Sequence, residues 1–231
     1  VVCGGVAGGG GEGVGGGGVG VGGVGGDGGG GGWCCGRHGI GRVGLGMMEL
    51  TEAKAAARKA AFARRKVAFE MSGKAQAGYL SEILAGHRGV ALAGFMPIRT
   101  EIDPLAAMEE AAAHGPVGVP VIQGAGQALK FARWEPDCDL VEGPFKAMIP
   151  ATLQYFEPEI LIVPLVAFDR NGGRLGYGGG FYDRSLEGLR AKRATLAIGF
   201  AFAAQEAENL PLEATDQPLD MIVTERGIIT V

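Results

Sequence analysis

The segment ILIVPLVAFDRNGGRLGYGGGFYDRSL, residues 160–186, decides the fold. Its first part, residues 160–168, is apolar except for Pro164. A continuous apolar run of this length is typical of a strand covered on both faces, as in a mostly parallel sheet. Because proline cannot donate to a strand ladder, we expect an interruption at Pro164. Turn residues 169–173 and a glycine-rich loop follow, and residues 181–191 are expected to form a helix.

Strands and helices alternate along the rest of the chain. Helices are expected over residues 51–70, 74–86 and 104–113, with Thr51 and Asp103 as N-caps and Pro104 in the first position of the third. Strands are expected over residues 90–95, 117–122, 128–134, 195–200 and 221–224, the last of these being the final strand. This alternation predicts an open, mostly parallel α/β sheet with helices on both faces, in which ligands gather at the carboxyl ends of the strands.

Residues 1–46 differ in composition from the rest, because they hold more than half of the 45 glycines and no Lys, Ser, Thr or Pro. So much glycine costs backbone entropy and offers little side chain to bury. We expect a low-complexity tail here, either disordered or an over-extended reading frame with translation starting at Met47 or Met48. The tail lacks the basic start and continuous apolar core of a signal peptide. Residues 47–231 are expected to form a single α/β catalytic domain.

Composition and charge exclude several classes of protein. Cys138 is the one cysteine of the sequence outside the glycine-rich tail, so we expect neither an internal disulfide nor a cysteine-rich zinc site in the domain, and a reducing, cytoplasmic setting fits. No apolar run of the sequence is long enough to span a membrane. The net charge of −4 argues against a broad nucleic-acid footprint. The expected partners are therefore small molecules.

The glycine loop lies in the context of a phosphate site. Glycines at positions 176 and 178–180 lack the Cβ atoms that would keep a phosphate away from backbone N–H groups, and the following helix points its positive end at the same place. Arg174 and Arg184 flank the loop as charge donors, and Asp183 is a carboxylate able to hold magnesium. No Lys-Ser or Lys-Thr follows, so this is not a Walker A sequence. A tight turn with a solvent-facing Asp183 is the alternative.

The run VPLVAFDRNGGRLGYGGGFYDR closely resembles the signature of the 5-formyltetrahydrofolate cyclo-ligase family, whose members are also called 5,10-methenyltetrahydrofolate synthetases. The resemblance extends over about residues 50–231 and includes further short motifs in the family's order. These motifs are the pair Lys54 and Arg58, Met96 with Glu101-Ile102-Asp103, Lys130-Phe131 with Trp134, Gly199 with Gln205, residues 215–220, and Thr224-Glu225. Such an ordered string of motifs is much more specific than any one of them.

The resemblance implies a reaction and a set of site residues. Members convert 5-formyltetrahydrofolate, with ATP and Mg²⁺, to 5,10-methenyltetrahydrofolate, ADP and phosphate. ATP binding is implied for Lys54, Arg58, Arg174, Leu175, Gly176, Tyr177, Gly178, Gly179, Gly180, Phe181 and Tyr182. The resemblance also implies Mg²⁺ ligands at Asp183 and Asp216, catalytic roles for Arg174 and Asp183, and folate contacts for Met96 and Glu101, with Tyr155 and Trp134 as candidates for ring stacking.

Simpler interpretations stay open for several of these residues. Lys54 and Arg58 also fit a solvated helix face, Met96 fits a core position, and Asp216 fits a turn residue before Pro218. Other functions stay open as well. A sugar-phosphate isomerase of related fold would need no ATP, a nucleotide-binding module would bind without turnover, and a glycine-rich interaction protein would act through its tail. A monomer is expected, with a homodimer as the alternative.

Three positions depart from the pattern of the family. Gly179 stands where some members place a lysine, so the phosphate charge would have to be met by arginines and lysines outside the loop. Thr215 stands before Asp216, where the family often has histidine. Phe181 replaces a common tyrosine, which removes one hydroxyl group.

Overall fold

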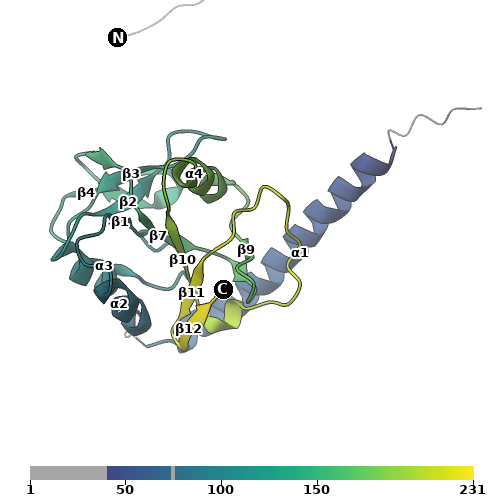
Figure 1. The fold of residues 1–231 in the computed structure, drawn as a ribbon. Helices are drawn as coiled ribbons and strands as arrows, with labels where there is room; N and C mark the ends of the chain where they lie inside the picture. Colours follow the sequence, from purple (N-terminus) through teal and green to yellow (C-terminus); the bar gives the residue numbers. More distant parts are fainter. Residues whose placement is uncertain (1–40, 74–75) are drawn as a thin grey trace, which may run out of the picture. The chain divides into compact units, whose positions relative to one another are not determined.

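The computed structural model describes residues 41–73 and 76–231, with side chains from Met48 onward (Figure 1). Most of the expected low-complexity tail, residues 1–40, lies outside the described residues. The α-helices of the described chain are α1 (Gly41–Met71), α2 (Gly78–Ala85), α3 (Leu105–Ala112) and α4 (Phe181–Arg190). None of the helices in these ranges is both long enough and apolar enough to cross a bilayer.

The start of α1 differs from the sequence-based expectation. α1 begins at Gly41, so the prediction of Thr51 as its N-cap is wrong. Residues 47–50, Met-Met-Glu-Leu, are strong helix formers and carry the helix upstream. The cap predicted for the third helix is one residue off, because α3 begins at Leu105 with Pro104 as its N-cap residue and without a side-chain cap hydrogen bond. Asp103 Oδ1 still accepts a hydrogen bond from the backbone N–H of Leu105 at 2.9 Å, just before the helix.

An eight-stranded sheet has the order β12-β11-β10-β7-β1-β2-β3-β6. Its strands are β1 (Leu92–Ala93), β2 (Val117–Val121), β3 (Lys130–Arg133), β6 (Tyr155–Phe156), β7 (Ile160–Pro164), β10 (Leu196–Phe200), β11 (Met221–Thr224) and β12 (Gly227–Thr230). The central strands, from β11 to β2, run parallel, whereas β12 and β3 pair antiparallel with their neighbours and β6 pairs antiparallel with β3. The expected open, mostly parallel α/β sheet is confirmed.

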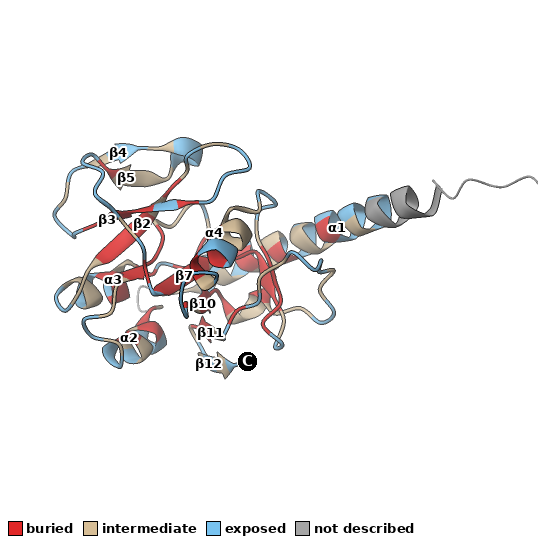
Figure 2. Cartoon of the chain, turned by 45° about the horizontal axis from the view of Figure 1, so that its top comes forward, coloured by how far each residue is buried: buried red, intermediate tan, exposed pale blue. Residues whose placement is uncertain are grey.

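Strand β7 shows why both faces of this sheet carry helices. Ile160 and Ile162 pack in a core cluster with side chains of α2 and α3, whereas Leu161 and Val163 pack in a second cluster with side chains of α4. Successive side chains of a strand point to opposite faces, so an apolar strand needs cover on both. Figure 2 shows this central strand buried between the two layers. The prediction of helices on both faces is therefore confirmed.

Several short elements carry little sequence signal. In the part of the chain that the structure describes, two small hairpins stand apart from the main sheet, β4 (Leu140–Glu142) with β5 (Met148–Pro150), and β8 (Ala167–Phe168) with β9 (Arg174–Leu175). The same part holds the 3-10 turns η1 (Pro144–Lys146) and η2 (Ala203–Gln205). The prediction that residues 221–224 form the final strand is wrong, because a further strand, β12, follows and folds back on β11. Strand β7 ends at Pro164, which confirms the interruption predicted there. Short strands of this kind form through tertiary pairing more than through local propensity.

Candidate active site

Four segments bring the candidate residues together. Strands β10, β7 and β1 are adjacent in the sheet. The connection that leaves β1 carries Glu101, the one that leaves β7 leads through the β8–β9 hairpin to the glycine loop, and the one that leaves β10 carries Asp216. Helix α1 packs against β8 and η2 and adds Lys54 and Arg58. Loops at the carboxyl ends of adjacent parallel strands are where α/β proteins bind ligands.

The glycine loop, residues 176–180, needs glycine for its backbone path. Gly178 and Gly180 have φ angles of 100° and 62°, in the left-handed region that side-chain-bearing residues rarely adopt. Gly180 is also the N-cap residue of α4, and this end of the helix has no side-chain cap hydrogen bond. The first backbone N–H groups of α4 are therefore available to an anion, and the helix dipole favours one there.

Two arginines hold the carbonyl groups of this loop. Arg58 Nε donates a hydrogen bond to the Gly176 carbonyl at 2.8 Å, and Arg184 Nη2 donates to the Gly179 carbonyl at 2.6 Å. The Arg184 guanidinium also lies over the Phe181 ring, 5.5 Å from its centroid. These contacts fix the loop from both sides, so neither arginine behaves as a solvated surface charge.

Asp183 lies in the first turn of α4 and pairs with a buried arginine. Arg174 is 5% exposed, and its Nη2 lies 2.7 Å from Asp183 Oδ1, which also accepts the backbone N–H of Gln217 at 3.0 Å. Burial lowers the pKa of the Arg174 guanidinium, and the charges of Asp183, Tyr182 and Asp216 oppose that shift. The Asp183 side chain is only 22% exposed, which excludes the solvent-facing turn residue considered above.

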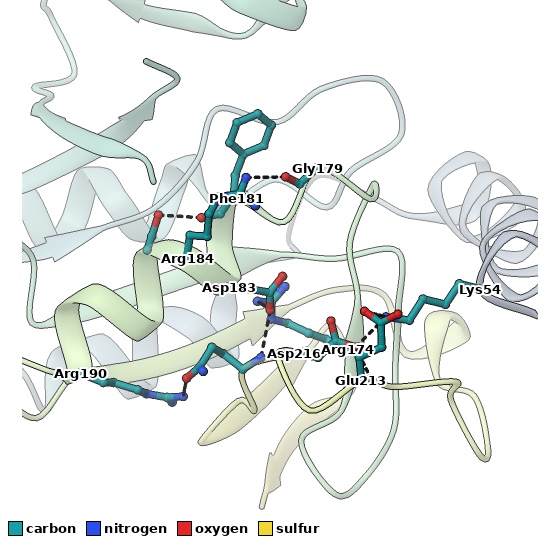
Figure 3. Close-up of polar contacts among 11 residues, drawn as sticks. Lys54, Arg174, Gly179, Phe181, Asp183, Arg184, Arg190, Glu213 and Asp216 are labelled. Atoms are coloured by element: carbon teal, nitrogen blue, oxygen red, sulfur yellow. Dashed lines mark hydrogen bonds and ion pairs between the residues drawn. The ribbon is translucent and has the colours of Figure 1, made fainter. Parts of the chain in front are cut away.

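Lys54 reaches this place from α1 (Figure 3). Its Nζ lies 2.8 Å from Asp216 Oδ2 and 3.2 Å from Glu213 Oε2, and its side chain is 11% exposed. Asp216 Oδ2 also accepts the backbone N–H of Glu213 at 2.8 Å. Lys54 is therefore a partly buried ion-pair partner and does not belong to a solvated helix face.

The donor set has features that fit a magnesium–nucleotide complex. Within the described ranges, no group of three or more His, Cys, Asp or Glu side chains is placed to hold a metal ion by itself. Asp183 and Asp216 each keep one carboxylate oxygen without a hydrogen bond to the described chain. The Arg174 Nε and the Tyr182 hydroxyl are also buried without a partner there. Two carboxylates suit Mg²⁺, which takes its remaining ligands from phosphate oxygens and water.

Glu101 lies in a separate, buried part of the site. It is 7% exposed, and its Oε2 accepts the backbone N–H of Ile98 at 2.9 Å. Its Oε1 accepts a hydrogen bond from the Tyr177 hydroxyl, also at 2.9 Å. Burial raises the pKa of the Glu101 carboxyl, and these hydrogen bonds oppose the shift. Burial also raises the pKa of Tyr177 to about 12, so the phenol stays a donor. Tyr177 thus links the glycine loop to Glu101.

Arg65 is a member of this cluster that the sequence analysis did not find. It is 1% exposed on α1, and its Nη1 lies 3.9 Å from Glu101 Oε1. A signal was present in the spacing. Positions 54, 58, 62 and 65 follow one face of a helix, so the Lys54–Arg58 pair extends through Phe62 to Arg65.

Three residues considered for contacts with folate lie in the core or on the edge strand β6. Trp134 is 4% exposed within the core cluster on the α2 and α3 side of the sheet, and Met96 packs against the same cluster. Tyr155 lies on the edge strand β6, with Lys130 Nζ 5.2 Å from its ring centroid. Ring stacking on a folate is therefore not supported for Trp134, because its side chain is packed in the core.

These features define an α/β protein with a glycine loop, two carboxylate–cation pairs and a buried acid on the connections that leave its parallel strands. Residues 50–225 match the 5-formyltetrahydrofolate cyclo-ligase family, and the chain belongs to that family.

Named relatives of the chain are enzymes of that family. It is 43% identical over 101 residues to the 5-formyltetrahydrofolate cyclo-ligase of Haemophilus influenzae, covering 41% of this chain and 54% of that protein. It is 37% identical over 141 residues to the enzyme of the same name from Escherichia coli K12, covering 58% and 76%. The chain thus spans about half the length of the first relative and three quarters of the second.

Two solved structures have the same fold. The 5,10-methenyltetrahydrofolate synthetase of Aquifex aeolicus superposes with a TM-score of 0.59 at 28% identity, over 77% of this chain and 92% of that one. A synthetase from Mycoplasma pneumoniae superposes with a TM-score of 0.54 at 21% identity, over 74% and 98%, which supports the fold alone.

Proposed function

We propose that this protein closes the folate ring of 5-formyltetrahydrofolate to give 5,10-methenyltetrahydrofolate, with conversion of ATP to ADP and phosphate in the presence of Mg²⁺. The observation that carries the proposal is the convergence of Lys54, Arg174, Asp183 and Asp216 beside a glycine loop, in a member of the cyclo-ligase family. The glycine loop alone would not support this function, because glycine loops occur in many proteins. The proposal therefore rests on the loop, the charged residues beside it and the family together.

On the phosphate side, ATP supplies the phosphoryl group that turns the formyl oxygen into a good leaving group, and Mg²⁺ neutralises phosphate charge. The uncapped start of α4 offers backbone N–H groups to phosphate oxygens. Lys54 and Arg174 bring positive charge, and the free oxygens of Asp183 and Asp216 would hold the ion. Positioning and charge neutralisation supply most of the catalysis in phosphoryl transfer.

On the folate side, Glu101 would accept hydrogen bonds from N–H groups of the pterin ring. A carboxylate with both oxygens already bonded keeps further lone pairs, so Glu101 can hold the ring while Ile98 and Tyr177 hold Glu101. Met96 would offer an adaptable apolar contact. Ring closure then follows when nitrogen 10 attacks the formyl carbon and loses its proton, and the phosphorylated oxygen leaves as inorganic phosphate.

Other functions are separated from this one by a direct assay. Purified protein is mixed with 5-formyltetrahydrofolate, ATP and Mg²⁺, and the near-ultraviolet absorbance of the methenyl product is followed together with ADP. We expect both signals to require all three components and to stop when a chelator removes Mg²⁺. ATP binding without turnover would favour a nucleotide-binding module, and activity on a sugar phosphate without ATP would favour an isomerase.

The expected setting and partners are part of the same proposal. Cys138 is a free thiol in the structure, in keeping with a reducing compartment such as the cytoplasm. We propose folate and ATP as the partners of the protein, which would act on them as a monomer or a homodimer.

A further inference from the structure

Arg65 is a buried charge that needs an explanation. It is 1% exposed, and its Nε donates a hydrogen bond to Thr100 Oγ1 at 3.1 Å. Its Nη1 is buried and has no hydrogen-bond partner within the described ranges. An arginine placed in this way costs free energy of desolvation unless a nearby charge offsets it.

The surroundings of Arg65 show what its charge acts on. Glu101 Oε1 lies 3.9 Å from Nη1, within the range of an ion pair and beyond that of a hydrogen bond. The guanidinium carbon lies 5.1 Å from the Phe62 ring centroid and 5.5 Å from that of Tyr177. Both distances fit cation–π contacts, which hold the two rings beside the cation.

Arg65 therefore touches both partners of the hydrogen bond between Tyr177 and Glu101. The two rings that it contacts, Phe62 and Tyr177, pack against each other with centroids 5.6 Å apart. Arg65 of α1 thus lies beside both Glu101, which follows β1, and Tyr177 of the glycine loop.

We propose that Arg65 is a positioning residue that acts as the buried counter-ion of Glu101 and aligns Glu101 and Tyr177 for the folate substrate. This inference rests on the proposed function, because it takes Glu101 as the group that binds the pterin ring. Arg65 touches no substrate in this arrangement, so its effect passes through Glu101. Its loss should weaken folate binding and leave ATP binding nearly unchanged.

The charge environment of Glu101 predicts a specific pH signature. Burial raises the pKa of Glu101, whereas Arg65 and Arg99 lower it, and the hydroxyls of Tyr177 and Tyr182 are the other titratable groups that face it. Loss of the Arg65 charge should raise the pKa of Glu101 further. A protonated Glu101 accepts fewer hydrogen bonds, so the KM for folate should then fall as the pH rises.

The test compares Arg65→Gln and Arg65→Lys with Arg64→Gln as a matched control. Arg64 is the neighbouring residue on the same helix, but its Nε donates to the Ala204 carbonyl at 2.8 Å and makes no contact with Glu101. The KM and kcat for 5-formyltetrahydrofolate and for ATP are measured as a function of pH, over the range in which the wild-type protein and the variants stay folded.

We expect Arg65→Gln to raise the KM for folate about tenfold at the acid end, less at the alkaline end, and to change the KM for ATP less than about twofold. Arg65→Lys restores the charge and should recover a flat profile. Arg64→Gln should lower thermal stability without changing either KM. If Arg65→Gln is unstable, Arg65→Met repeats the test without a buried polar group.

Two outcomes separate this inference from the function on which it rests. If Arg65→Gln and Arg64→Gln show the same KM values and pH profiles while the wild-type protein is active, Arg65 has only a structural role and the inference is overturned. If the wild-type protein shows no folate-dependent turnover, the proposed function fails, and the inference falls with it.

Discussion

The two halves of the candidate site balance charge in different ways. On the phosphate side, Arg174 pairs with Asp183 and Lys54 pairs with Asp216, and both carboxylates remain about a fifth exposed. On the folate side, Glu101 and Arg65 are both almost fully buried and lie 3.9 Å apart. A partly exposed pair can exchange partners with an incoming ion at modest cost, whereas a buried pair cannot. If the two halves bind phosphate and folate as proposed, the phosphate side is the adjustable one and the folate side is preset.

The largest effect should come from breaking the phosphate side at Asp183. Asp183→Asn removes the charge that both neutralises Arg174 and would hold Mg²⁺, so kcat should fall at least about a hundredfold. Turnover is followed by the absorbance of the methenyl product. Asp137→Asn, which removes an exposed carboxylate elsewhere, is the control and should leave kcat unchanged. A kcat within about threefold of wild type in Asp183→Asn would contradict the assignment.

A smaller effect is expected when a cation is removed from the same side. Lys54→Met should raise the KM for ATP about tenfold and leave the KM for folate unchanged, because a charge-assisted contact to phosphate is lost. Glu213→Gln removes only the outer, half-exposed partner of Lys54 and should change neither KM by more than about twofold. Equal effects of Lys54→Met on both KM values would show that the two sides are not separate.

The folate side should reveal itself in the pH dependence of stability. Because the pKa of Glu101 is raised in the folded protein, the folded state binds the proton more tightly than the unfolded state. Its contribution to stability is therefore lost as the pH rises from the ordinary value of 4.5 through the raised one. Thermal unfolding of Glu101→Gln should lack this decline. The same variant should raise the KM for folate about tenfold. Parallel pH curves for wild type and variant would contradict the raised pKa.

The smallest effect is expected from the link between the two sides. Tyr177→Phe removes the O–H donated to Glu101 and keeps the ring beside Arg65, so the KM for folate should rise about threefold. Phe62→Leu is the companion variant, because it removes one ring of the tilted Phe62–Tyr177 pair and keeps the hydrogen bond. A larger effect of Phe62→Leu on the KM would show that ring packing matters more than the hydrogen bond.

Local patterns predicted elements with strong periodicity or strong turn chemistry. The apolar strand before the interruption at Pro164 and the helix after the glycine loop appear where the sequence placed them, whereas the N-cap of α3 is Pro104 and not Asp103. The predicted start of α1 was wrong, because good helix formers precede Thr51 and override the preference of threonine for the N-cap position. Strand β12 was missed, because its pairing with β11 depends on a tertiary contact.

The candidate site divides in the same way. The glycine loop and its neighbours lie on one continuous segment, so the sequence alone could place them together. Lys54 and Asp216 are separated by 162 residues, and only the packing of α1 brings them within 2.8 Å. Arg65 was overlooked because a buried arginine and a surface arginine look alike on a helix until the neighbouring elements are known.

The sequence by itself determined the class of sheet, the strand–loop–helix unit that contains the glycine loop, and the resemblance to the 5-formyltetrahydrofolate cyclo-ligase family. Those features depend on side-chain periodicity and on glycine geometry, which act over a few residues. The tertiary structure alone decided which cation meets which carboxylate, that the Tyr177 hydroxyl donates to Glu101, and that Arg65 lies beside both residues. Those contacts depend on burial and on long-range packing, which no local pattern records.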